Sequence, residues 1–529
     1  MDKHTGQIAN INNKYVIIND IKFINETPIL FSLLPNDIVE YEVILGKINI
    51  IRLIERKPQI IMGIIKSLEL NKAVICVPGL PKFFSLKINN QNNELTVYSI
   101  VILKISINNV EVVEKYDSIR NRINDKSIFV KMYNENSSLC KILPDYVDSE
   151  SFYSNEIKDL THLYSFNIDP TESKDFDDAI SIDENENKIY IHIVDANEQI
   201  LKRDEIDINA LKQSFTLYLP EHIQNILPSE LAENKLSLIR GEDRKTITTE
   251  FLIDPINQNI LNYSIYKSII KIKKRYDYEE FNTDLFKFPK LYNFYKRWKR
   301  ETLNIPHVKL IIDKSTGKLI NSRLENNFDD AHKVVETLMI LTNLTISKHV
   351  SNLFPQRYHS KIKNEFKIES FTNNEIIDSI LTIKKFKSAI YDQTKSGHFG
   401  LGLSTYTHFT SPIRRYFDVI VHRNLAGVKY TNIEDILDHI NNREKYIEKL
   451  VECYNNLKFL SYFEENINNI WSCYIISIKS NGLVVMLDEN LYEIFIFDSN
   501  STNYKIGDKV NVKIKSIDWI NLNVKAKIM

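Results

Sequence analysis

The residues best suited to chemistry are four aspartates that fall within ten positions, Asp169, Asp175, Asp177 and Asp178. Four like charges in so short a stretch repel one another, and folded proteins commonly relieve such repulsion by placing divalent cations between the carboxylates. Metal ions held by carboxylates can activate a water and stabilise a leaving oxygen in phosphoryl chemistry. The cluster therefore predicts a metal-dependent enzyme that acts on phosphates.

Two other interpretations of this stretch were weighed. A solvated acidic turn is disfavoured because residues 164–168 and 179–182, on either side, have the composition of buried or half-buried strands. A calcium loop fails on spacing, since Lys174 stands where that loop needs glycine and Ile180 where it needs glutamate. Side chains alternate along an extended chain, so the second and third aspartates are expected on one side, with the first and fourth closing a cage. Such a cage could hold two Mg²⁺ ions about 3.5–4 Å apart.

A second polar group lies far downstream, in residues 408–423. Residues 410–412, Thr-Ser-Pro, have the types that begin a helix, and they predict a helix start there. Helix N-termini attract anions, and Arg414 in the first turn could grip a phosphate with two parallel hydrogen bonds. Taken alone, Arg414 and Arg415 would more simply pair with surface acids. Together with the aspartates, they predict the other half of a phosphodiester site.

With these residues in view, the chain resembles the ribonuclease II / ribonuclease R family of exoribonucleases, with its RNB catalytic domain. The resemblance covers residues 158 to about 425, roughly half of the chain, in blocks that follow the family's order. The blocks are 158–161 with 166–170 and 175–179, then 189–195, then 218–220, 227–228 and 236–238 with Arg244, then 267–270 and 275–279, then 336–343, and finally 397–400 leading into 410–416. Lys158 stands where arginine is common and Asn167 where threonine is common, and neither belongs to the aspartate cage.

The resemblance implies an activity and a metal. Similar proteins hydrolyse single-stranded RNA from its 3′ end, by two-metal-ion catalysis, and release nucleoside 5′-monophosphates. Carried over by motif, Asp169, Asp175, Asp177 and Asp178 would be the metal-binding and catalytic acids, and Arg414 would contact the scissile phosphate. The expected cofactor is Mg²⁺, with Mn²⁺ as the alternative, because both ions prefer oxygen ligands.

Three further residues are expected to contact RNA. Tyr218 resembles the aromatic residue that stacks on a base near the 3′ terminus, a contact that tolerates any base. Arg415 is expected to bind the RNA beside Arg414. Glu452 is the candidate for a glutamate near the terminal nucleotide, although its neighbour Cys453 replaces the arginine that the family pattern leads us to expect.

Two other functions remain open at this point. A catalytically silent RNA-binding protein could use the same scaffold, but all four aspartates are present here, which favours an enzyme. A phosphodiesterase acting on DNA is the other alternative. Net charge is −1, so a nucleic-acid partner needs a local basic surface. Residues 267–300 mix cationic and aromatic side chains and could form either an RNA channel wall or an ordinary solvated face.

The elements that must position these residues indicate a multidomain protein of 529 residues. The expected fold is a mixed α/β (α+β) RNB core flanked by all-β OB-fold barrels. We expect cold-shock-like barrels at 1–58 and 59–118, a polar, irregular linker at 119–157, the RNB domain at 158–465 and an S1-like barrel at 470–529. The first barrel is predicted from short strands at 15–18, 29–31, 39–43 and 48–52, and an inert β-domain is the competing interpretation.

The remaining patterns concern the C-terminal part and the compartment. Residues 433–465 have the apolar periodicity of long helices. The S1-like barrel is basic, which suits a phosphate backbone, through Lys505, Lys509, Lys513, Lys515, Lys525 and Lys527. Four cysteines without metal spacing suit a reducing compartment, and neither a membrane-spanning run nor a signal peptide is evident. We therefore expect a cytoplasmic monomer that binds single-stranded RNA and no membrane, with membership of a degradative complex left open.

Overall fold

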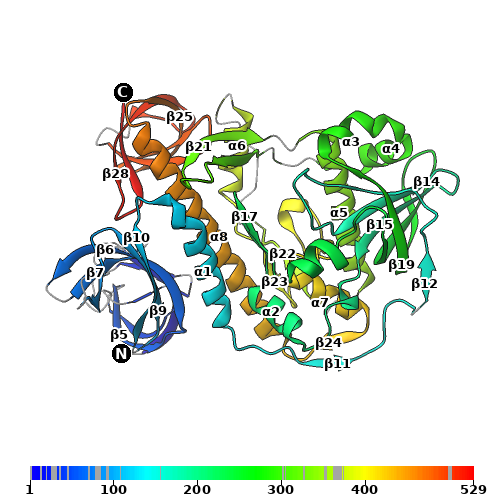
Figure 1. Ribbon diagram of the computed structural model, residues 1–529, viewed down its shortest axis with the longest axis horizontal. Helices are drawn as coiled ribbons and strands as arrows, with labels where there is room; N and C mark the ends of the chain where they lie inside the picture. Colours follow the sequence, from blue (N-terminus) through cyan, green and yellow to red (C-terminus); the bar gives the residue numbers. More distant parts are fainter. Residues whose placement is uncertain are drawn as a thin grey trace.

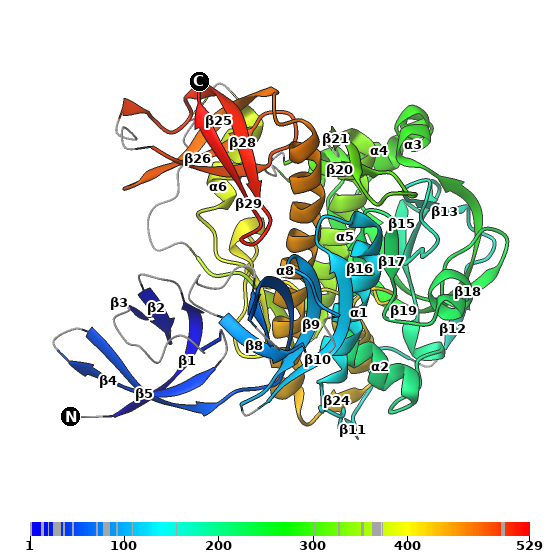
Figure 2. The ribbon, with the colours of Figure 1, turned by 60° about the vertical axis from the view of Figure 1, so that its left-hand side comes forward.

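The computed structural model consists of β-barrels that lie beside a larger α/β core, with one long helix between them (Figure 1). It describes the chain apart from residues 1–2, 12–14, 20, 25–32, 35–36, 45–46, 70–71, 78–84, 91–93, 108, 155, 301–302, 304, 326–327, 351–353, 362–371, 373 and 499–502. The barrels gather on one side of the long helix and the core lies on the other (Figure 2).

The N-terminal barrel is built from alternating strands whose inward residues are apolar. Its strands are β1 (His4–Ile11), β2 (Tyr15–Ile18), β3 (Ile21–Ile24), β4 (Ile38–Ile44) and β5 (Lys47–Glu55). They follow the order β3-β2-β1-β4-β5, and β3 also approaches β5, so the sheet curls on itself. The strands predicted at 15–18, 39–43 and 48–52 lie within β2, β4 and β5, whereas the strand predicted at 29–31 falls outside the described residues.

The second barrel repeats this arrangement in the order β10-β9-β6-β7-β8. Its strands are β6 (Gln59–Glu69), β7 (Lys72–Cys76), β8 (Ser85–Asn89), β9 (Ser99–Ile105) and β10 (Val110–Ser118). The side of β9 that faces the barrel is mainly apolar, because Val101, Leu103 and Ile105 are buried there with Ile65 and Ile75 of the neighbouring strands.

The prediction of an irregular linker at 119–157 was wrong in its first half. A short turn of helix, η2 (Arg122–Asn124), leads into α1 (Asp125–Ser138), and only later does the chain run extended through β11 (Tyr146–Asp148). Ile128, Phe129, Met132 and Tyr133 form the buried face of α1, at the spacing of a helix. The many polar residues between them hide this period in the sequence.

The core is organised around one sheet that returns to itself. Its strands are β12 (Ile157–Asp159), β13 (Ser165–Ile168), β14 (Asp178–Asp183), β15 (Lys188–Val194), β18 (Asp243–Ile253) and β19 (Ile260–Tyr276). The 17-residue strand β19 pairs antiparallel with β18 over its first part and parallel with β13 near its end. Because β13 and β14 are antiparallel neighbours, the loop 169–177 leaves and re-enters the sheet at one edge.

Helices and small hairpins cover this sheet. The helices are α2 (Glu205–Gln213), α3 (Tyr278–Asp284), α4 (Pro289–Trp298), α5 (Asp330–His349), α6 (Glu375–Ile383) and α7 (Tyr416–Leu425). Shorter turns are η3 (Ala196–Glu198), η4 (Leu231–Lys235), η5 (Leu285–Lys287) and η6 (Phe399–Leu401). The paired short strands are β16 (Leu217–Leu219) with β17 (His222–Gln224), β20 (His307–Ile312) with β21 (Leu319–Glu325), β22 (Gln356–Tyr358) with β23 (Ile390–Asp392), and β11 with β24 (Val428–Tyr430).

The long helices predicted at 433–465 are a single helix, α8 (Ile433–Glu465), of 33 residues. At 1.5 Å per residue such a helix is about 50 Å long. It contacts α1, β16, β21 and the C-terminal barrel in turn. It is therefore the element against which both the barrels and the core are placed (Figure 1).

The C-terminal barrel consists of β25 (Ile470–Lys479), β26 (Gly482–Leu487), β27 (Glu493–Phe497), β28 (Lys509–Asp518) and β29 (Asn523–Ile528). The order is β27-β26-β25-β28-β29, and β27 also approaches β29. The predicted fold class, a mixed α/β core flanked by β-barrels, is confirmed. In the described part of the chain, no helix has the length and apolar character needed to cross a bilayer.

Candidate active site

The acidic loop is fastened to the end of β19 on one side. Asp169 follows β13 directly, and its N–H donates to the carbonyl of Tyr276 at 3.2 Å. The Arg275 guanidinium donates to the carbonyls of Pro170 and Thr171, each at 2.8 Å. These bonds hold the first half of the loop by its backbone, so the carboxylates are left for other partners.

On the other side the loop is fixed around Phe176, which is buried. The Phe176 N–H donates to Ser237 Oγ at 3.0 Å, and that hydroxyl donates to the carbonyl of Lys174 at 2.7 Å. The Arg275 guanidinium also lies over the Phe176 ring, 4.8 Å from its centre. Because Phe176 points inward, its neighbours Asp175 and Asp177 are directed to the same site, where they meet Tyr218 and an arginine from a distant segment.

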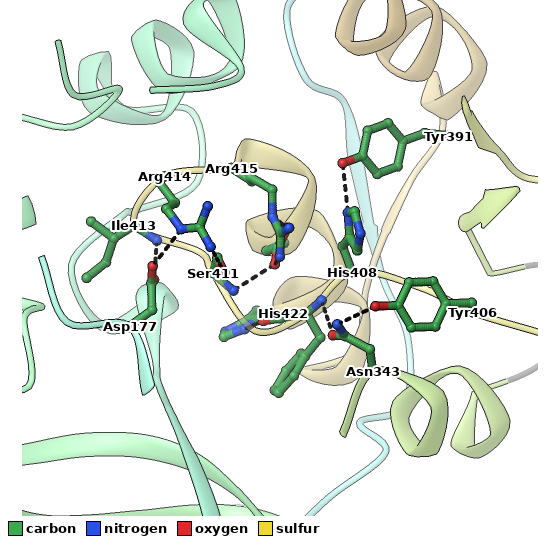
Figure 3. Close-up of polar contacts among 12 residues, drawn as sticks. Asp177, Asn343, Tyr391, Tyr406, His408, Ser411, Ile413, Arg414, Arg415 and His422 are labelled. Atoms are coloured by element: carbon green, nitrogen blue, oxygen red, sulfur yellow. Dashed lines mark hydrogen bonds and ion pairs between the residues drawn. The ribbon is translucent and has the colours of Figure 1, made fainter. Parts of the chain in front are cut away.

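That arginine is Arg414. The N–H of Ile413 donates to Asp177 Oδ1 at 2.8 Å, and Arg414 Nε lies 3.5 Å from Asp177 Oδ2 (Figure 3). The guanidinium is further oriented by a 3.0 Å bond from Nη2 to Ser411 Oγ. The Asp177 side chain is only 5% exposed, whereas that of Arg414 is 43% exposed. The structure thus brings the acidic loop and Arg414 together and leaves the cation accessible to a ligand.

The prediction of a helix start at 410–412 was wrong. Residues 412–414 form a turn, and α7 begins only at Tyr416. The physical reason is Asp418, whose Oδ1 accepts the N–H of Ser411 at 2.8 Å, so that the chain bends before the helix begins. Arg414 therefore lies in the turn that precedes the helix.

Arg415, expected to contact RNA, is engaged within the protein. Its Nε and Nη2 donate to the two oxygens of Asp418 at 2.9 and 2.7 Å, and its side chain is 17% exposed. Burial is the largest single influence and lowers the pKa of Arg415, but Asp418 together with Tyr391 and Tyr406 acts in the opposite direction, so the pKa is raised. Its visible role is to hold the turn that carries Arg414.

The electrostatics of the aspartates are unusual. Burial is the main cause that raises the pKa of all four carboxyls, to about 8 for Asp177 and about 6 for Asp178. The pKa of Asp169 lies well above its ordinary value, and its second cause is repulsion from Asp178. Arg414 lowers the pKa of Asp175, Asp177 and Asp178 without cancelling the effect of burial. The protein alone therefore disfavours the fully ionised form of the cluster, and a bound cation would favour it.

These carboxylates have the chemistry of ligands for a hard divalent cation, because such ions prefer oxygen donors and supply the missing positive charge. Within the described residues, no three Asp, Glu, His or Cys side chains are already arranged as a group that could hold a metal ion. Asp177 is instead occupied by Ile413 and Arg414. The donor set fits the cation, and binding requires the carboxylates to turn toward a common ion.

Tyr218 borders the same site. It lies on β16, is 43% exposed, and its hydroxyl lies 3.5 Å from Asp175 Oδ2. Burial of the hydroxyl is the main cause that raises its pKa, and Arg414 opposes this. The backbone before β16 is joined to the arginine segment, since the Thr216 N–H donates to the Arg414 carbonyl at 3.0 Å. Glu452, in contrast, lies on the exposed side of α8, and no hydrogen bond or ion pair in the described residues joins it to the aspartates.

Several residues that support the site were given no role from the sequence. Asn343 on α5 accepts the Phe409 N–H at 2.8 Å and donates to the Tyr406 hydroxyl at 3.1 Å (Figure 3). The Tyr391 hydroxyl and His408 Nδ1 are 2.9 Å apart, and burial lowers the pKa of His408 well below its ordinary value. These contacts fix the irregular segment that leads to Ser411. One signal for Asn343 was available from the sequence, because this residue lies in the block 336–343 that resembles the ribonuclease II / ribonuclease R family.

The basic and aromatic stretch 267–300 places several of its aromatic rings in the core, and whether its polar face contacts RNA stays a prediction. Tyr276, Phe294 and Tyr295 are buried in the main hydrophobic core. Lys271 pairs with Asp243 at 3.1 Å. The aromatic residues recur among the charges because this stretch contains a core strand and a core helix, each with one polar face.

Comparisons with known proteins agree with this geometry. The family model described as "RNB domain" matches residues 157–431. Among curated proteins, the chain is 26% identical over 458 residues to a ribonuclease R of Chlamydia pneumoniae, covering 72% of this chain and 68% of the relative. It is 27% identical over 496 residues to a ribonuclease R of Aquifex aeolicus, with 76% and 70% covered.

Solved structures share the fold at lower identity. Mycoplasma genitalium RNase R in complex with ribose-methylated single-stranded RNA superimposes with a TM-score of 0.79, 20% identity, and 99% and 100% of the two chains covered. Yeast Ssd1, described as a pseudonuclease, superimposes with a TM-score of 0.70, 13% identity, and 97% and 82% covered. The fold is therefore common to nucleases and to at least one protein described as inactive.

Proposed function

The chain belongs to the RNB domain family, and on that premise we propose that it is an exoribonuclease that hydrolyses single-stranded RNA from the 3′ end to nucleoside 5′-monophosphates. The relatives named ribonuclease R support the assignment of exoribonuclease activity to this chain. The 3′ to 5′ direction, the products and the metal requirement are parts of the proposal.

One observation carries the proposal. Asp177 is bound by the backbone of Ile413 and lies 3.5 Å from Arg414 Nε, so residues more than two hundred positions apart meet in one site. Acids that bind cations and an exposed guanidinium that binds anions are the two halves that phosphodiester hydrolysis needs. Because 43% of the Arg414 side chain is exposed, a ligand can reach its guanidinium while the same side chain contacts Asp177.

Each residue then has a role that its surroundings allow. Arg414 binds the scissile phosphate and neutralises charge that develops on its oxygens. The acidic side chains would hold two divalent ions, either Mg²⁺ or Mn²⁺, and the ligands are Asp169, Asp175, Asp177 and Asp178. When bound, these ions would supply an activated water and stabilise the leaving oxygen. When a phosphate takes Arg414, Asp177 loses that partner and can turn to a cation.

Tyr218 is proposed to stack on a base next to the site. Its ring is half exposed while its hydroxyl is directed to Asp175, so the ring is held in place by its polar end. Stacking on an aromatic ring is indifferent to base identity, which suits an enzyme that degrades any sequence. The two similar structures of Mycoplasma genitalium RNase R with single-stranded and double-stranded RNA support RNA as the ligand.

A catalytically silent RNA-binding protein is the second candidate. It is favoured by the structural likeness to yeast Ssd1, a pseudonuclease, which shows that this fold alone does not decide between activity and its loss. The four aspartates and the exposed Arg414 favour the enzyme.

A 5′-labelled oligoribonucleotide incubated with Mg²⁺, and in parallel with a chelator, separates the two candidates. We expect a ladder that shortens from the 3′ end and nucleoside 5′-monophosphates with Mg²⁺, and no cleavage with chelator. Intact RNA in both samples, despite binding, would establish the silent protein. A DNA oligomer of the same sequence is expected to remain intact, and its degradation would replace RNA by DNA as the substrate class.

The Asp177→Asn variant tests the site itself. We expect it to abolish mononucleotide release while RNA affinity stays within about threefold, because the phosphate backbone and stacking contacts are unchanged. Cleavage at the wild-type rate would remove Asp177 from the proposed machinery. We propose further that the protein works in the cytoplasm as a monomer, consistent with its four free cysteines.

A further inference from the structure

The hairpin β16–β17 has two faces that serve different parts of the molecule. Leu217 and Leu219 are buried in the hydrophobic core that α8 shares with the barrels. Tyr218 between them is directed the opposite way, to Asp175, as alternation along a strand requires. The position of the Tyr218 ring in the active site therefore depends on how the hairpin is anchored at its far side.

The turn of this hairpin does not provide the anchor. Leu219 pairs with His222, so the loop has only two residues, Pro220 and Glu221. Two-residue hairpin loops are most stable when the first loop residue has a positive φ, which proline cannot adopt. Isolated two-stranded hairpins are also marginal in water. Contacts from outside the hairpin must hold it.

Besides the packing of the two leucines, polar contacts hold the turn at Glu221. Its side chain is 17% exposed, and its Oε1 accepts a hydrogen bond from the hydroxyl of Tyr454 on α8. The ammonium group of Lys458, one helical turn further along α8, lies 3.8 Å from the same oxygen. Tyr454 is itself fixed, because it is fully buried with its ring edge-on to Phe129 of α1 at 5.2 Å.

Lys458 connects Glu221 to a buried cluster of charges. Its ammonium lies 2.9 Å from Asp125 Oδ2 and donates to the Gly317 carbonyl at 2.6 Å. Arg122 lies 3.7 Å from the same aspartate, with its guanidinium 5.2 Å from the ring centre of Trp519 in the C-terminal barrel. The cations Arg122 and Lys458 thus balance the anions Asp125 and Glu221 at the point where α1, α8, the hairpin β16–β17 and the C-terminal barrel meet.

We propose that Glu221 and Tyr454 are positioning residues that set the place of Tyr218 in the active site through the hairpin β16–β17. The inference rests on the proposed function, because it assigns a consequence for the 3′-terminal nucleotide. Neither residue touches the reacting groups. Their effect passes along a hairpin that is braced at Glu221 and presents Tyr218 three residues earlier.

The test uses Tyr454→Phe in the full-length protein, because this variant removes only the hydroxyl that donates to Glu221 and leaves every charge in place. Tyr446→Phe is the matched control: Tyr446 also lies on α8, and its hydroxyl donates to the Met132 carbonyl of α1 at 3.1 Å, away from the hairpin. Two readouts are compared: steady-state hydrolysis of a single-stranded RNA, and the fluorescence of RNA with 2-aminopurine at its 3′ end, measured in chelator.

For Tyr454→Phe we expect kcat to fall about tenfold while KM stays within twofold, because misplacement affects the reacting geometry more than the binding of the strand. We also expect most of the 2-aminopurine quenching to be lost. Tyr446→Phe should match the wild type in both measurements. Glu221→Gln, which keeps a hydrogen-bond acceptor for Tyr454, should lie closer to the wild type than Tyr454→Phe.

Equal behaviour of Tyr454→Phe and Tyr446→Phe in quenching and kcat would overturn the inference. If the wild type binds the RNA and quenches the 2-aminopurine probe but never cleaves the RNA, the proposed function fails. In that case, a loss of quenching in Tyr454→Phe but not in Tyr446→Phe would still support the positioning role. If the wild type cleaves but Tyr454→Phe quenches fully and retains its kcat, only the positioning role fails.

Discussion

At the scale of single residues, Arg414 is placed mainly by its own backbone. Its N–H donates to the Ser411 carbonyl at 3.3 Å and its carbonyl accepts the Thr216 N–H at 3.0 Å. The contact between Arg414 Nε and Asp177 Oδ2 is long, at 3.5 Å, and 43% of the Arg414 side chain is open to solvent. The guanidinium is therefore free to exchange Asp177 for a phosphate without loss of the local fold.

Arg414→Lys tests this role. Lysine keeps the charge but loses the planar pair of donors, so we expect kcat to fall about 10²-fold with only a small loss of RNA affinity. Single-turnover cleavage of a labelled oligoribonucleotide, together with a filter-binding titration, measures both quantities. A kcat within threefold of the wild type would show that a point charge suffices at this position.

The raised carboxyl pKa values predict a pH dependence in the metal-free protein. Asp177 has a pKa of about 8 in the fold, against about 3.9 for an unfolded aspartate. Its contribution to stability is therefore complete below the unfolded value and is lost as the pH rises through the folded value. In chelator, the melting temperature of the wild type should fall relative to that of Asp177→Asn between pH 5 and pH 9.

Comparing the two proteins at each pH cancels the titration of groups that do not interact with Asp177. Added Mg²⁺ should reduce the difference at high pH, because the cation replaces the proton on the cluster. Melting curves that stay parallel across this range would contradict the assignment of a raised pKa to Asp177.

The roles of single residues could be predicted from the sequence only where several charged side chains lie close together along the chain. The aspartate cluster and Arg414 stand out by charge density, and the structure brings Asp177 and Arg414 together. Asn343 and Asp418 accept the backbone N–H groups of Phe409 and Ser411, which no sequence spacing reveals. Pairing of Arg415 with an acid was an open alternative, and the partner is the buried Asp418.

At the scale of elements, the turn between β20 and β21 is set by one glycine. Gly317 has a φ of +70°, and a Cβ there would lie 2.3 Å from the Arg122 carbonyl oxygen. Its own carbonyl accepts the bond from Lys458. This turn therefore closes over the buried cluster only because a side chain is absent.

Gly317→Ala is expected to destabilise the protein by more than about 2 kcal/mol, since it adds a backbone clash to the cost of a left-handed conformation. Gly241→Ala is the control, because Gly241 has a φ of +90° and nothing within 4 Å of its Cβ position. The control should cost only about 1–2 kcal/mol. Thermal unfolding measures both, and equal effects would show that Arg122 can move away without cost.

Elements with a clear period were predictable, and those shaped by distant contacts were not. The apolar spacing over 433–465 indicated helix, and α8 occupies that range. Helix α1 was missed because its buried residues are separated by polar ones. The helix predicted at 410–412 begins later because the Asp418 carboxylate binds the backbone of Ser411, and this contact depends on the fold around it.

At the scale of the whole molecule, a net charge of −1 leaves RNA binding to local surfaces. On the outer face of the C-terminal barrel, Lys515, Lys525 and Lys527 are exposed, while Val512 and Val524 face the barrel core. This alternation places the lysines where a phosphate backbone can reach them.

Replacing these three lysines by glutamine should weaken binding of single-stranded RNA and reduce the slope of log affinity against log salt by up to about 2, since each phosphate contact to a single strand contributes roughly 0.7. Titrations at several salt concentrations give the slope. The matching triple arginine variant keeps the charge and should keep the slope. An unchanged slope in the glutamine variant would move the RNA path away from this face.

The whole-molecule plan was predictable because each barrel and the core has its own composition, and the resemblance supplied their order. The contacts between the domains were not predictable, since Arg122, Lys458 and Trp519 are isolated residues in three unrelated segments. Their meeting depends on the path of α8, and nothing in their local sequence signals it.

The hydrophobic core around α8 has a consequence for protein engineering. It is shared by Ile60 of the second barrel, Phe129 of α1, Leu217 of the hairpin and Trp471 of the C-terminal barrel. A chimera with a foreign C-terminal barrel would lack the side chains that fit this apolar surface. In the native protein, limited proteolysis should not release the C-terminal barrel as a stable fragment. Although the barrels look like interchangeable modules, the second barrel, α1, α8, the hairpin and the C-terminal barrel should unfold together in a single transition.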